Sequence, residues 1–255
     1  AFLFRQAGLD CALAHCNFHL RGDDSNHDMQ LVQQLAADWQ MPLFVQEFDT
    51  PTLVRQSDLS MEMLARKLRY DWFAEVGRDY DSIVTAHHAN DAAETMLLNL
   101  TRGTGLKGMT SIPETNGKII RPMLCFTAEE IRQFAQQHGI PFAIDCTNSD
   151  EHIKRNRVRA SIIPQLQLLN PNLIETMSRN RKLFQQQYAF YRRQMDEVLQ
   201  RVCHHDGHNC IVDVPLLTQH SDHNLILTEL LQNYGFAPTI AEELLQNPKT
   251  GSQHH

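Results

Sequence analysis

The sequence predicts an α/β fold in which a parallel sheet carries helices on both faces, followed by a helical segment and part of an accessory domain. Two observations support this fold class. Short apolar runs alternate with helical patterns of roughly ten to fifteen residues, as in βαβ units. The stretch Ser82–Gly108 combines both patterns, because an apolar pair ends at two histidines and apolar residues then recur at helical spacing.

The strands are expected where short apolar runs lie between turn signals. The first follows a short helix that includes Phe2, Leu3 and Phe4 and ends at Gly8, and the turn Arg21-Gly22 closes it. The predicted strands are Cys11–Asn17, Leu43–Phe48, Ser82–Ala86, Ile119–Pro122 and Phe142–Asp145.

The helices between these strands are predicted from apolar stripes and capping residues. The helix from Ser25 has an apolar face of Leu31, Val32, Leu35 and Trp39. Further helices are expected from about Ser60, from Asn90 as a plausible N-cap to the terminator Gly103, over Ala128–His138 and over Leu173–Val202.

Composition indicates a soluble globular protein. The chain has 255 residues, of which 42% are hydrophobic and 21% charged, and no apolar run approaches the roughly 18 residues of a membrane helix. The first residues lack the features of a secretory signal. The six cysteines contain no C-x-x-C pair, which favours a reduced, cytoplasmic protein over a disulfide framework.

The segment Cys203–Cys210, CHHDGHNC, has two interpretations. Its cysteines and histidines are metal-ligand types. Asp206-Gly207 is also a turn signal before a strand-like run, so we expect a β-hairpin here.

Polar groups gather where the third predicted strand ends. Asp91 and Glu94 lie three residues apart on one helical face, directly after His87 and His88. Ligands bind at the carboxyl edge of open parallel sheets, so this is the expected place for chemistry. Acidic residues in a first helical turn also stabilise the helix dipole with no further function, and that alternative stays open for Asp91.

Glycines follow the same helix. Gly103, Gly105 and Gly108 satisfy G-x-G-x-x-G, but they follow a helix, whereas a dinucleotide fingerprint follows a strand. A glycine-rich loop can still approach a ligand closely with its backbone, so a supporting role in a nucleotide site is retained.

Charge is distributed unevenly. The net charge is −7, which argues against a protein that coats nucleic acid indiscriminately. Between Ile153 and Arg193, however, nine residues are basic and one, Glu175, is acidic. The basic residues are Lys154, Arg155, Arg157, Arg159, Arg179, Arg181, Lys182, Arg192 and Arg193. Such a tract is often a solvated face, but it is also compatible with contacts to phosphates.

Several motifs together resemble the tRNA(Ile)-lysidine synthase family. They are HCNFHLRG at 15–22, E-x-x-A-R-x-x-R-Y at 62–70, AHHANDAAET at 86–95, RGTGLKGM at 102–109, RPML at 121–124, DCTN at 145–148 and RNRVR at 155–159. The match covers most of residues 10–175 in order and spacing.

The resemblance implies an N-type ATP pyrophosphatase (PP-loop) domain, of the adenine nucleotide α-hydrolase-like fold, over residues 1–170. Residues 171–255 would then be a helical linker and the start of a C-terminal tRNA-binding domain. The implied reaction is a ligation that modifies tRNA. ATP adenylates C2 of the wobble cytidine in tRNA(Ile) with a CAU anticodon, and free lysine displaces AMP to give lysidine.

The chain departs from the family in one respect. The family's ATP-binding loop, S-G-G-x-D-S, does not occur in these residues, and Ala1–Ala7 resembles the helix that follows it. We therefore expect the first strand and phosphate loop upstream of Ala1. The Mg²⁺ site is expected there too, with no protein metal ligand in this chain.

Site residues are assigned by combining the resemblance with the chemistry. Carboxylates suit a lysine ammonium, and arginines and Mg²⁺ stabilise charge on phosphate oxygens. The catalytic residues are expected to be Asp91, Glu94, Arg69 and Arg155, with lysine bound by His87, Asp91 and Glu94. ATP binding is assigned to His15, Asn17, Phe18, Arg66, Arg102, Gly103 and Gly105, and tRNA binding to Lys154, Arg157, Arg159, Arg179, Arg181 and Lys182.

Other functions stay open at this point. A related ATP pyrophosphatase could thiolate tRNA, although paired cysteines are missing. A metal-dependent hydrolase could use His87, His88, Asp91 and Glu94 as ligands. A third alternative is a non-catalytic tRNA-binding fragment. The expected partners are tRNA(Ile) and lysine, with no membrane, and a homodimer is left open.

Overall fold

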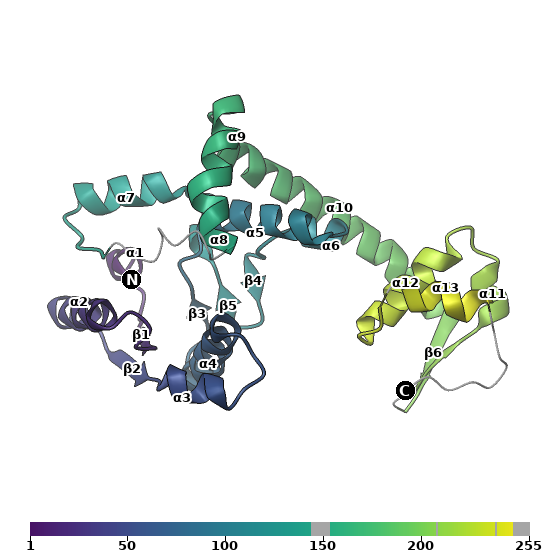
Figure 1. The fold of residues 1–255 in the computed structure, drawn as a ribbon, viewed down its shortest axis with the longest axis horizontal. Helices are drawn as coiled ribbons and strands as arrows, with labels where there is room; N and C mark the ends of the chain where they lie inside the picture. The colour runs from purple at the N-terminus through teal and green to yellow at the C-terminus, as the bar shows by residue number, and fades with distance from the viewer. Residues whose placement is uncertain (144–153, 208, 238, 247–255) are drawn as a thin grey trace. The chain divides into compact units, whose positions relative to one another are not determined.

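The computed structural model describes residues 1–143, 154–207, 209–237 and 239–246. The chain forms two compact units, Ala1–Arg181 and Lys182–His255 (Figure 1). They divide within the long helix α10 (Leu173–Val202), whereas the sequence predicts a domain boundary after residue 170. The predicted DCTN motif at 145–148, and the end of the strand predicted from Phe142, lie outside the described residues.

The first unit begins with a parallel βαβ element. Strand β1 (Leu13–Asn17) pairs in parallel with β2 (Leu43–Glu47), and helix α2 (Asp23–Trp39) connects them. Asn17 lies opposite Glu47, so both strands end at the same edge. The predicted parallel pairing is therefore confirmed here.

A second sheet has the order β3-β5-β4. Strand β3 (Ile83–Val84) is parallel to β5 (Ile119–Ile120), and β4 (Thr115–Asn116) runs antiparallel to β5. In the described part of the chain the strands thus form two separate sheets in this unit, with one antiparallel pair that the sequence pattern does not predict. Lys118 connects this sheet to the turn between α4 and β3, because its ammonium donates to the carbonyls of Gly77, Arg78 and Tyr80.

Helices surround these sheets. They are α1 (Phe2–Gln6), α3 (Thr50–Arg55), α4 (Met61–Val76), α5 (Ala89–Arg102), α6 (Leu106–Met109), α7 (Ala128–Gln137), α8 (Lys154–Arg157) and α9 (Ile163–Leu169), with 3-10 turns at Gly77–Asp79 and Pro122–Cys125. A π-helical turn, Val158–Ile162, joins α8 to α9. Helix α4 begins where it was predicted, and Ser60 is its N-cap, because the Ser60 hydroxyl accepts a hydrogen bond from Met63 N.

The N-cap of α5 differs from the prediction. His88 is the cap, since its Nδ1 accepts from Asp91 N, and Asp91 accepts in return from His88 N. Asn90 instead accepts from the backbone N–H of Ala128, the first residue of α7. The predicted cap therefore connects the starts of two helices.

The second unit packs around the end of α10. Its other elements are β6 (Cys203–Asp206), β7 (Asn209–Val212), α11 (Val214–Thr218), α12 (His223–Asn233) and α13 (Thr239–Gln246). The two strands pair antiparallel, with Gly207 at φ +60°, which confirms the predicted hairpin. Val202, Leu217 and Ile226 lie in a closed apolar core.

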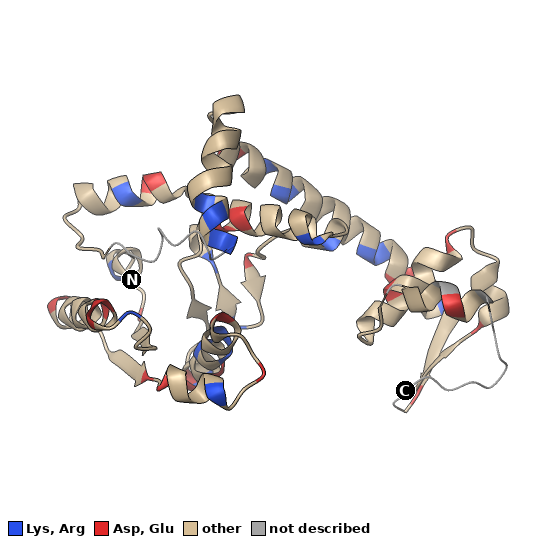
Figure 2. Cartoon of the chain, viewed as in Figure 1, with Lys and Arg blue, Asp and Glu red and all other residues tan. Residues whose placement is uncertain are grey.

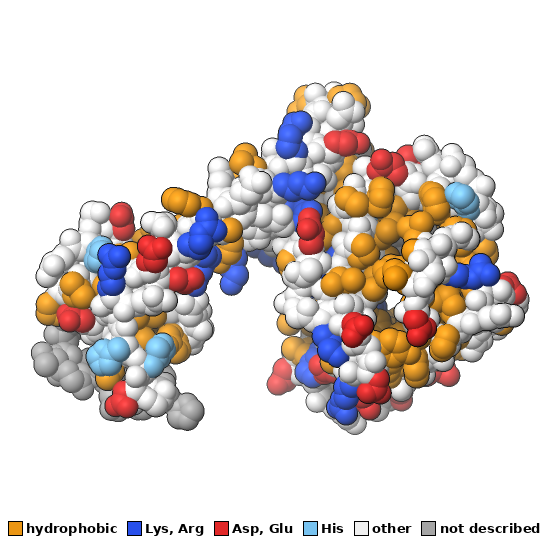
Figure 3. Space-filling view, turned by 180° about the vertical axis from the view of Figure 1, so that it is seen from behind, with side chains coloured by type: hydrophobic (Ala, Val, Ile, Leu, Met, Phe, Trp, Pro, Cys, Tyr) orange, Lys and Arg blue, Asp and Glu red, His pale blue; other side chains and the backbone are white. Residues whose placement is uncertain are grey.

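Large apolar side chains also reach the surface. On the strands of the first unit, Phe44 is 39% exposed and Val84 42% exposed. Figure 3 shows hydrophobic side chains gathered over one face of this unit. Among the described helices, none has both the length and the apolar character needed to cross a bilayer.

Candidate functional site

Glu94 is the buried centre of an ion-pair network whose arginines are partly exposed. It lies on α5, three residues after Asp91, and its side chain is 0% exposed. Arg159 binds it with two hydrogen bonds, from Nε to Oε1 at 2.6 Å and from NH2 to Oε2 at 3.1 Å. The Nε of Arg155 lies 3.3 Å from Oε2. Two guanidinium groups therefore surround one buried carboxylate.

Asp91 lies at the edge of this network. Its Oδ2 caps the helix by accepting from His88 N at 2.9 Å, while its Oδ1 lies 3.7 Å from NH2 of Arg159. Asp91 therefore does cap the helix, as the alternative interpretation predicted, and its other oxygen faces the Arg159 guanidinium. Figure 2 shows basic residues of α8 beside acidic residues of α5.

His87 stands next to these carboxylates. Its Nδ1 lies 3.0 Å from the Thr85 hydroxyl. Burial holds the pKa of His87 below its ordinary value of 6.5; the Asp91 carboxylate opposes this shift, and the guanidinium groups of Arg121, Arg155 and Arg66 reinforce it. The lowered pKa favours the neutral form of the His87 imidazole at pH 7.

The His87→Gln substitution is expected to flatten the loss of stability in acid. Because the pKa of His87 is lowered by folding, the unfolded chain takes up the proton first as pH falls below about 6.5. Protonation thus favours unfolding until the pH passes the folded-state pKa. Urea unfolding at several pH values between about 7.5 and 5 should show a smaller decrease for the variant than for the unmodified protein.

His15, whose pKa burial also lowers, is unchanged in that variant, so part of the acid sensitivity should remain. Identical decreases in both proteins would mean that His87 titrates alike in the folded and unfolded chains.

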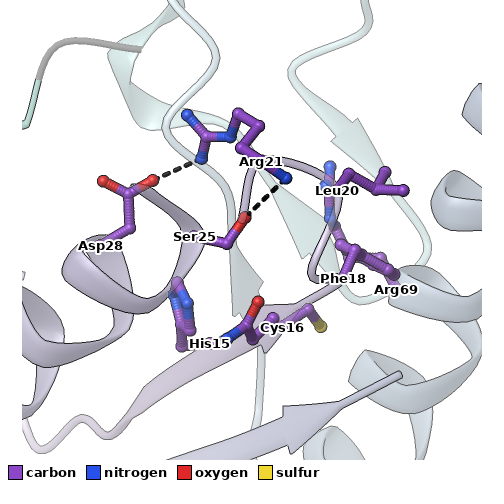
Figure 4. A pocket seen from close by; sticks show the side chains of 9 residues that line it. His15, Cys16, Phe18, Leu20, Arg21, Ser25, Asp28 and Arg69 are labelled. Atoms are coloured by element: carbon purple, nitrogen blue, oxygen red, sulfur yellow. Dashed lines mark hydrogen bonds and ion pairs between the residues drawn. The ribbon is translucent and has the colours of Figure 1, made fainter. Parts of the chain in front are cut away.

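A cavity of about 200 Å³ opens where β1 ends (Figure 4). His15 and Phe18, predicted to bind ATP, line it together with Arg69. The guanidinium of Arg69 lies 5.2 Å from the centre of the Phe18 ring. This volume is below the roughly 300 Å³ at which pockets for drug-sized ligands begin, so these residues enclose room for part of a nucleotide.

Asn17, which was predicted to bind ATP, makes structural hydrogen bonds beside this cavity. It is 2% exposed, and its amide donates to Asn26 Oδ1 while its carbonyl oxygen accepts from His19 N. The side chain therefore shapes the turn after β1.

Five residues that line this cavity were not predicted as site residues: Cys16, Leu20, Arg21, Ser25 and Asp28. Arg21 forms an ion pair with Asp28, and the Ser25 hydroxyl accepts from Arg21 N. Arg21 belongs to the HCNFHLRG motif, so the sequence contained a signal for it. Ser25 and Asp28 lie on α2, where the sequence indicated only helix.

The predicted glycine loop and its neighbours lie at the other end of α5. Gly103, at φ +78°, ends this helix, and the predicted nucleotide ligands Arg102 and Gly105 are exposed. The Asn99 amide donates to Gly108 O at 2.9 Å and so ties the loop back to α5. Arg66, another predicted ATP ligand, stacks over Tyr70 at 4.9 Å.

The basic tract divides into inward-facing and outward-facing residues. Arg155 and Arg159 contact Glu94, although the Arg159 side chain, predicted to bind tRNA, is still 37% exposed. The exposed members are Lys154, Arg157, Arg179, Lys182 and Arg193, and the first four of these were predicted to contact tRNA.

Arg181 is a correction to the predicted tRNA contacts. It is 1% exposed, and its guanidinium donates to the carbonyl of Ile112 at 3.0 Å and to Glu114 Oε1 at 3.3 Å. Arg121, also buried, donates to the neighbouring Pro113 carbonyl. Two buried arginines thus hold one short segment after α6.

The ligand set required by the metal-dependent hydrolase alternative does not form. Within the described ranges, no three or more His, Cys, Asp or Glu side chains are arranged to hold a metal ion. The acids proposed as ligands are paired with arginines instead.

Comparison with known proteins gives a consistent picture. The model of the PP-loop domain matches residues 2–166. A tRNA(Ile)-lysidine synthase from Bacteroides thetaiotaomicron is 36% identical over 232 residues, which are 90% of this chain and 54% of that protein. One from Porphyromonas gingivalis is 36% identical over 98% of this chain and 56% of its own length. The chain thus spans about half the length of these curated relatives.

Among solved structures, the chain resembles the U34-tRNA thiolase NcsA from Methanococcus maripaludis, determined with its [4Fe-4S] cluster. The TM-score is 0.51 at 14% identity, over 68% of this chain and 61% of that one. This likeness shows the fold alone, and it agrees with the predicted α/β architecture.

Proposed function

Because the chain belongs to the PP-loop domain family, we propose that it is the catalytic part of an ATP-dependent ligase that joins lysine to a tRNA. The substrate is the wobble cytidine of tRNA(Ile) with a CAU anticodon, and the product is lysidine. The proposal is supported by relatives named tRNA(Ile)-lysidine synthase that match 90% and 98% of the chain. The observation that carries it is the pair Asp91 and Glu94, already bound to cationic groups beside the end of β3.

The carboxylate pair suits a lysine ammonium. A charge-assisted hydrogen bond to a carboxylate contributes roughly twice as much as a neutral one, and burial of Glu94 strengthens it further. Neutral His87 does not repel an incoming cation. The amine must then lose a proton before it attacks C2 of the cytidine, because only the free amine has the electron pair that forms the new bond.

The cavity after β1 is the proposed position of ATP. Its donor set, an imidazole, a guanidinium and an aromatic ring from His15, Arg69 and Phe18, fits the chemistry of a nucleotide. When bound, ATP and Mg²⁺ supply the activated phosphate that converts the cytidine C2 oxygen into a leaving group. Arg69 would bind a phosphate oxygen and Phe18 would hold the guanidinium in place.

The outward-facing basic residues Lys154, Arg157, Arg179 and Lys182 are proposed to contact tRNA phosphates. Arg155 and Arg159 are proposed to act at the carboxylate pair instead, because their guanidinium groups already reach it.

Transfer of lysine is tested with the protein expressed from its full gene. Incubation with ATP, labelled lysine and a tRNA(Ile) transcript with the CAU anticodon should place the label in RNA. Omission of ATP should abolish labelling, and so should changing the wobble cytidine to uridine. Mass spectrometry of the digested RNA would identify the modified nucleoside.

Arg132→Met is a suitable control protein, because Arg132 is an exposed residue of α7 that pairs with Glu129. In a parallel incubation with sulfide in place of lysine, RNA that acquires sulfur would establish tRNA thiolation instead. Binding of the tRNA with no transfer at any lysine concentration would establish the non-catalytic alternative.

A further inference from the structure

Arg159 occupies the position that a substrate cation would need. Its guanidinium uses both oxygens of Glu94, at 2.6 and 3.1 Å, and approaches Asp91 at 3.7 Å. The Glu94 side chain is 0% exposed, whereas that of Arg159 is 37% exposed. An ammonium arriving from solvent therefore meets the guanidinium before it meets Glu94.

The charges at the site do not favour simultaneous occupancy. Arg155 and Arg159 already place two positive charges beside Glu94 and Asp91. A third cation within a few ångströms would repel both guanidinium groups, and burial weakens the solvent screening of that repulsion. Substrate binding at Glu94 is therefore easier if one guanidinium leaves.

The backbone around Arg159 is suited to such a movement. Arg159 lies in the π-helical turn Val158–Ile162, between helices α8 and α9. A π-helical turn contains one residue more than the α-helical repeat and is found often at functional sites. Arg155 lies outside this turn and contacts Thr95 as well as Glu94.

We propose that Arg159 is a specificity-determining residue, an internal cation that covers the Asp91–Glu94 pair until the ammonium of the substrate displaces it. The inference rests on the proposed function in taking lysine as that substrate. A cation that binds the two carboxylates weakly does not displace the bidentate Arg159 guanidinium, so Asp91 and Glu94 do not bind it. The displaced guanidinium keeps its charge and joins the outward-facing basic residues, which makes lysine binding and tRNA binding mutually favourable.

Calorimetric titration of L-lysine into the protein from the full gene tests the exchange. A ligand whose site is available only part of the time binds with an affinity reduced by that fraction. Arg159→Met should therefore lower the Kd for lysine by about tenfold, because a competing charge-assisted contact is lost. Arg132→Met removes an exposed arginine of α7 and should leave the Kd for lysine unchanged. An unchanged or higher Kd in folded Arg159→Met would overturn the proposal.

Guanidinium at millimolar concentration is the second probe. It should raise the melting temperature of Arg159→Met by refilling the vacated position, and it should have no such effect on Arg132→Met. Absence of this difference would contradict the exchange. Arg159→Lys serves if the methionine variant does not fold, because an ammonium at this position cannot form the bidentate contact; its Kd for lysine should fall several-fold, and an unchanged value counts against the proposal.

Failure of the proposed function gives a different pattern. If the unmodified protein binds no lysine and transfers none, yet guanidinium stabilises Arg159→Met, the internal cation is confirmed and lysine is the wrong substrate. If lysidine is formed while Arg159→Met binds lysine no more tightly, the function stands and the exchange is wrong.

Discussion

Glu94→Gln should lower both the stability of the protein and its use of lysine. The amide would leave Arg155 and Arg159 facing a neutral group; these side chains are 33% and 37% exposed, so loss of the charge-assisted contacts should cost about 1.5–3 kcal/mol. Loss of a charge-assisted contact to lysine should raise the lysine concentration needed for half-maximal transfer by roughly ten- to a hundredfold. Urea unfolding and transfer kinetics at varied lysine concentrations measure the two effects.

Two other acid-to-amide substitutions are compared with Glu94→Gln, one on an exposed ion pair and one at the neighbouring carboxylate. Glu129→Gln alters an exposed ion pair on α7, and its stability should change by less than about 0.5 kcal/mol. Asp91→Asn should impair lysine use with a smaller loss of stability, because Asp91 is only partly engaged with Arg159. A Glu94→Gln protein that loses stability but keeps its lysine dependence would make Glu94 a purely structural residue.

Arg181→Met should destabilise the protein without weakening its electrostatic attraction to tRNA. The substitution removes the hydrogen bond from the Arg181 guanidinium to the part-buried Ile112 carbonyl, and loss of a hydrogen bond to a charged group costs about 1.5–3 kcal/mol. Because Arg181 is 1% exposed, it is not expected to reach a phosphate. The dependence of tRNA affinity on salt should therefore keep its slope.

Arg179→Ala should have the reverse effects of Arg181→Met, with stability unchanged and the salt dependence of tRNA binding reduced. Arg179 is exposed, so stability should change by less than about 0.5 kcal/mol. The salt slope should decrease by about one unit if the residue contacts one phosphate. A decreased slope for Arg181→Met, measured in folded protein, would restore Arg181 to the tRNA contacts.

Long periodic elements were predictable from the sequence, because periodicity is a local property. The bounds of Leu173–Val202 agree with the predicted helix, and Asp206-Gly207 predicted the hairpin between β6 and β7. Strand β4 was missed because two residues, Thr115 and Asn116, contain no detectable alternation. Its antiparallel pairing with β5 depends on a tertiary contact that no local pattern encodes.

The strand and helix around the candidate site were predictable from the sequence, but the side-chain contacts were not. The motif around Asp91 and Glu94 predicted a helix after a strand, and α5 does follow β3. The basic tract gave no means of separating Arg159 and Arg181 from Arg157. What separates them is the position of acceptors far away in the sequence, Glu94 for Arg159 and Ile112 for Arg181.

The contact between Arg159 and Glu94 also has a consequence for the order of folding. It joins residues that are 65 positions apart in the sequence, with β5 and α7 between them along the chain. Closing so long a loop costs chain entropy before the ion pair can return any free energy, so this pair is expected to form late, after the local helices and the βαβ element. Interactions absent from the folding transition state act mainly on the unfolding rate. The guanidinium that covers the carboxylates therefore delays the opening of the native protein while leaving the speed of its folding almost unchanged.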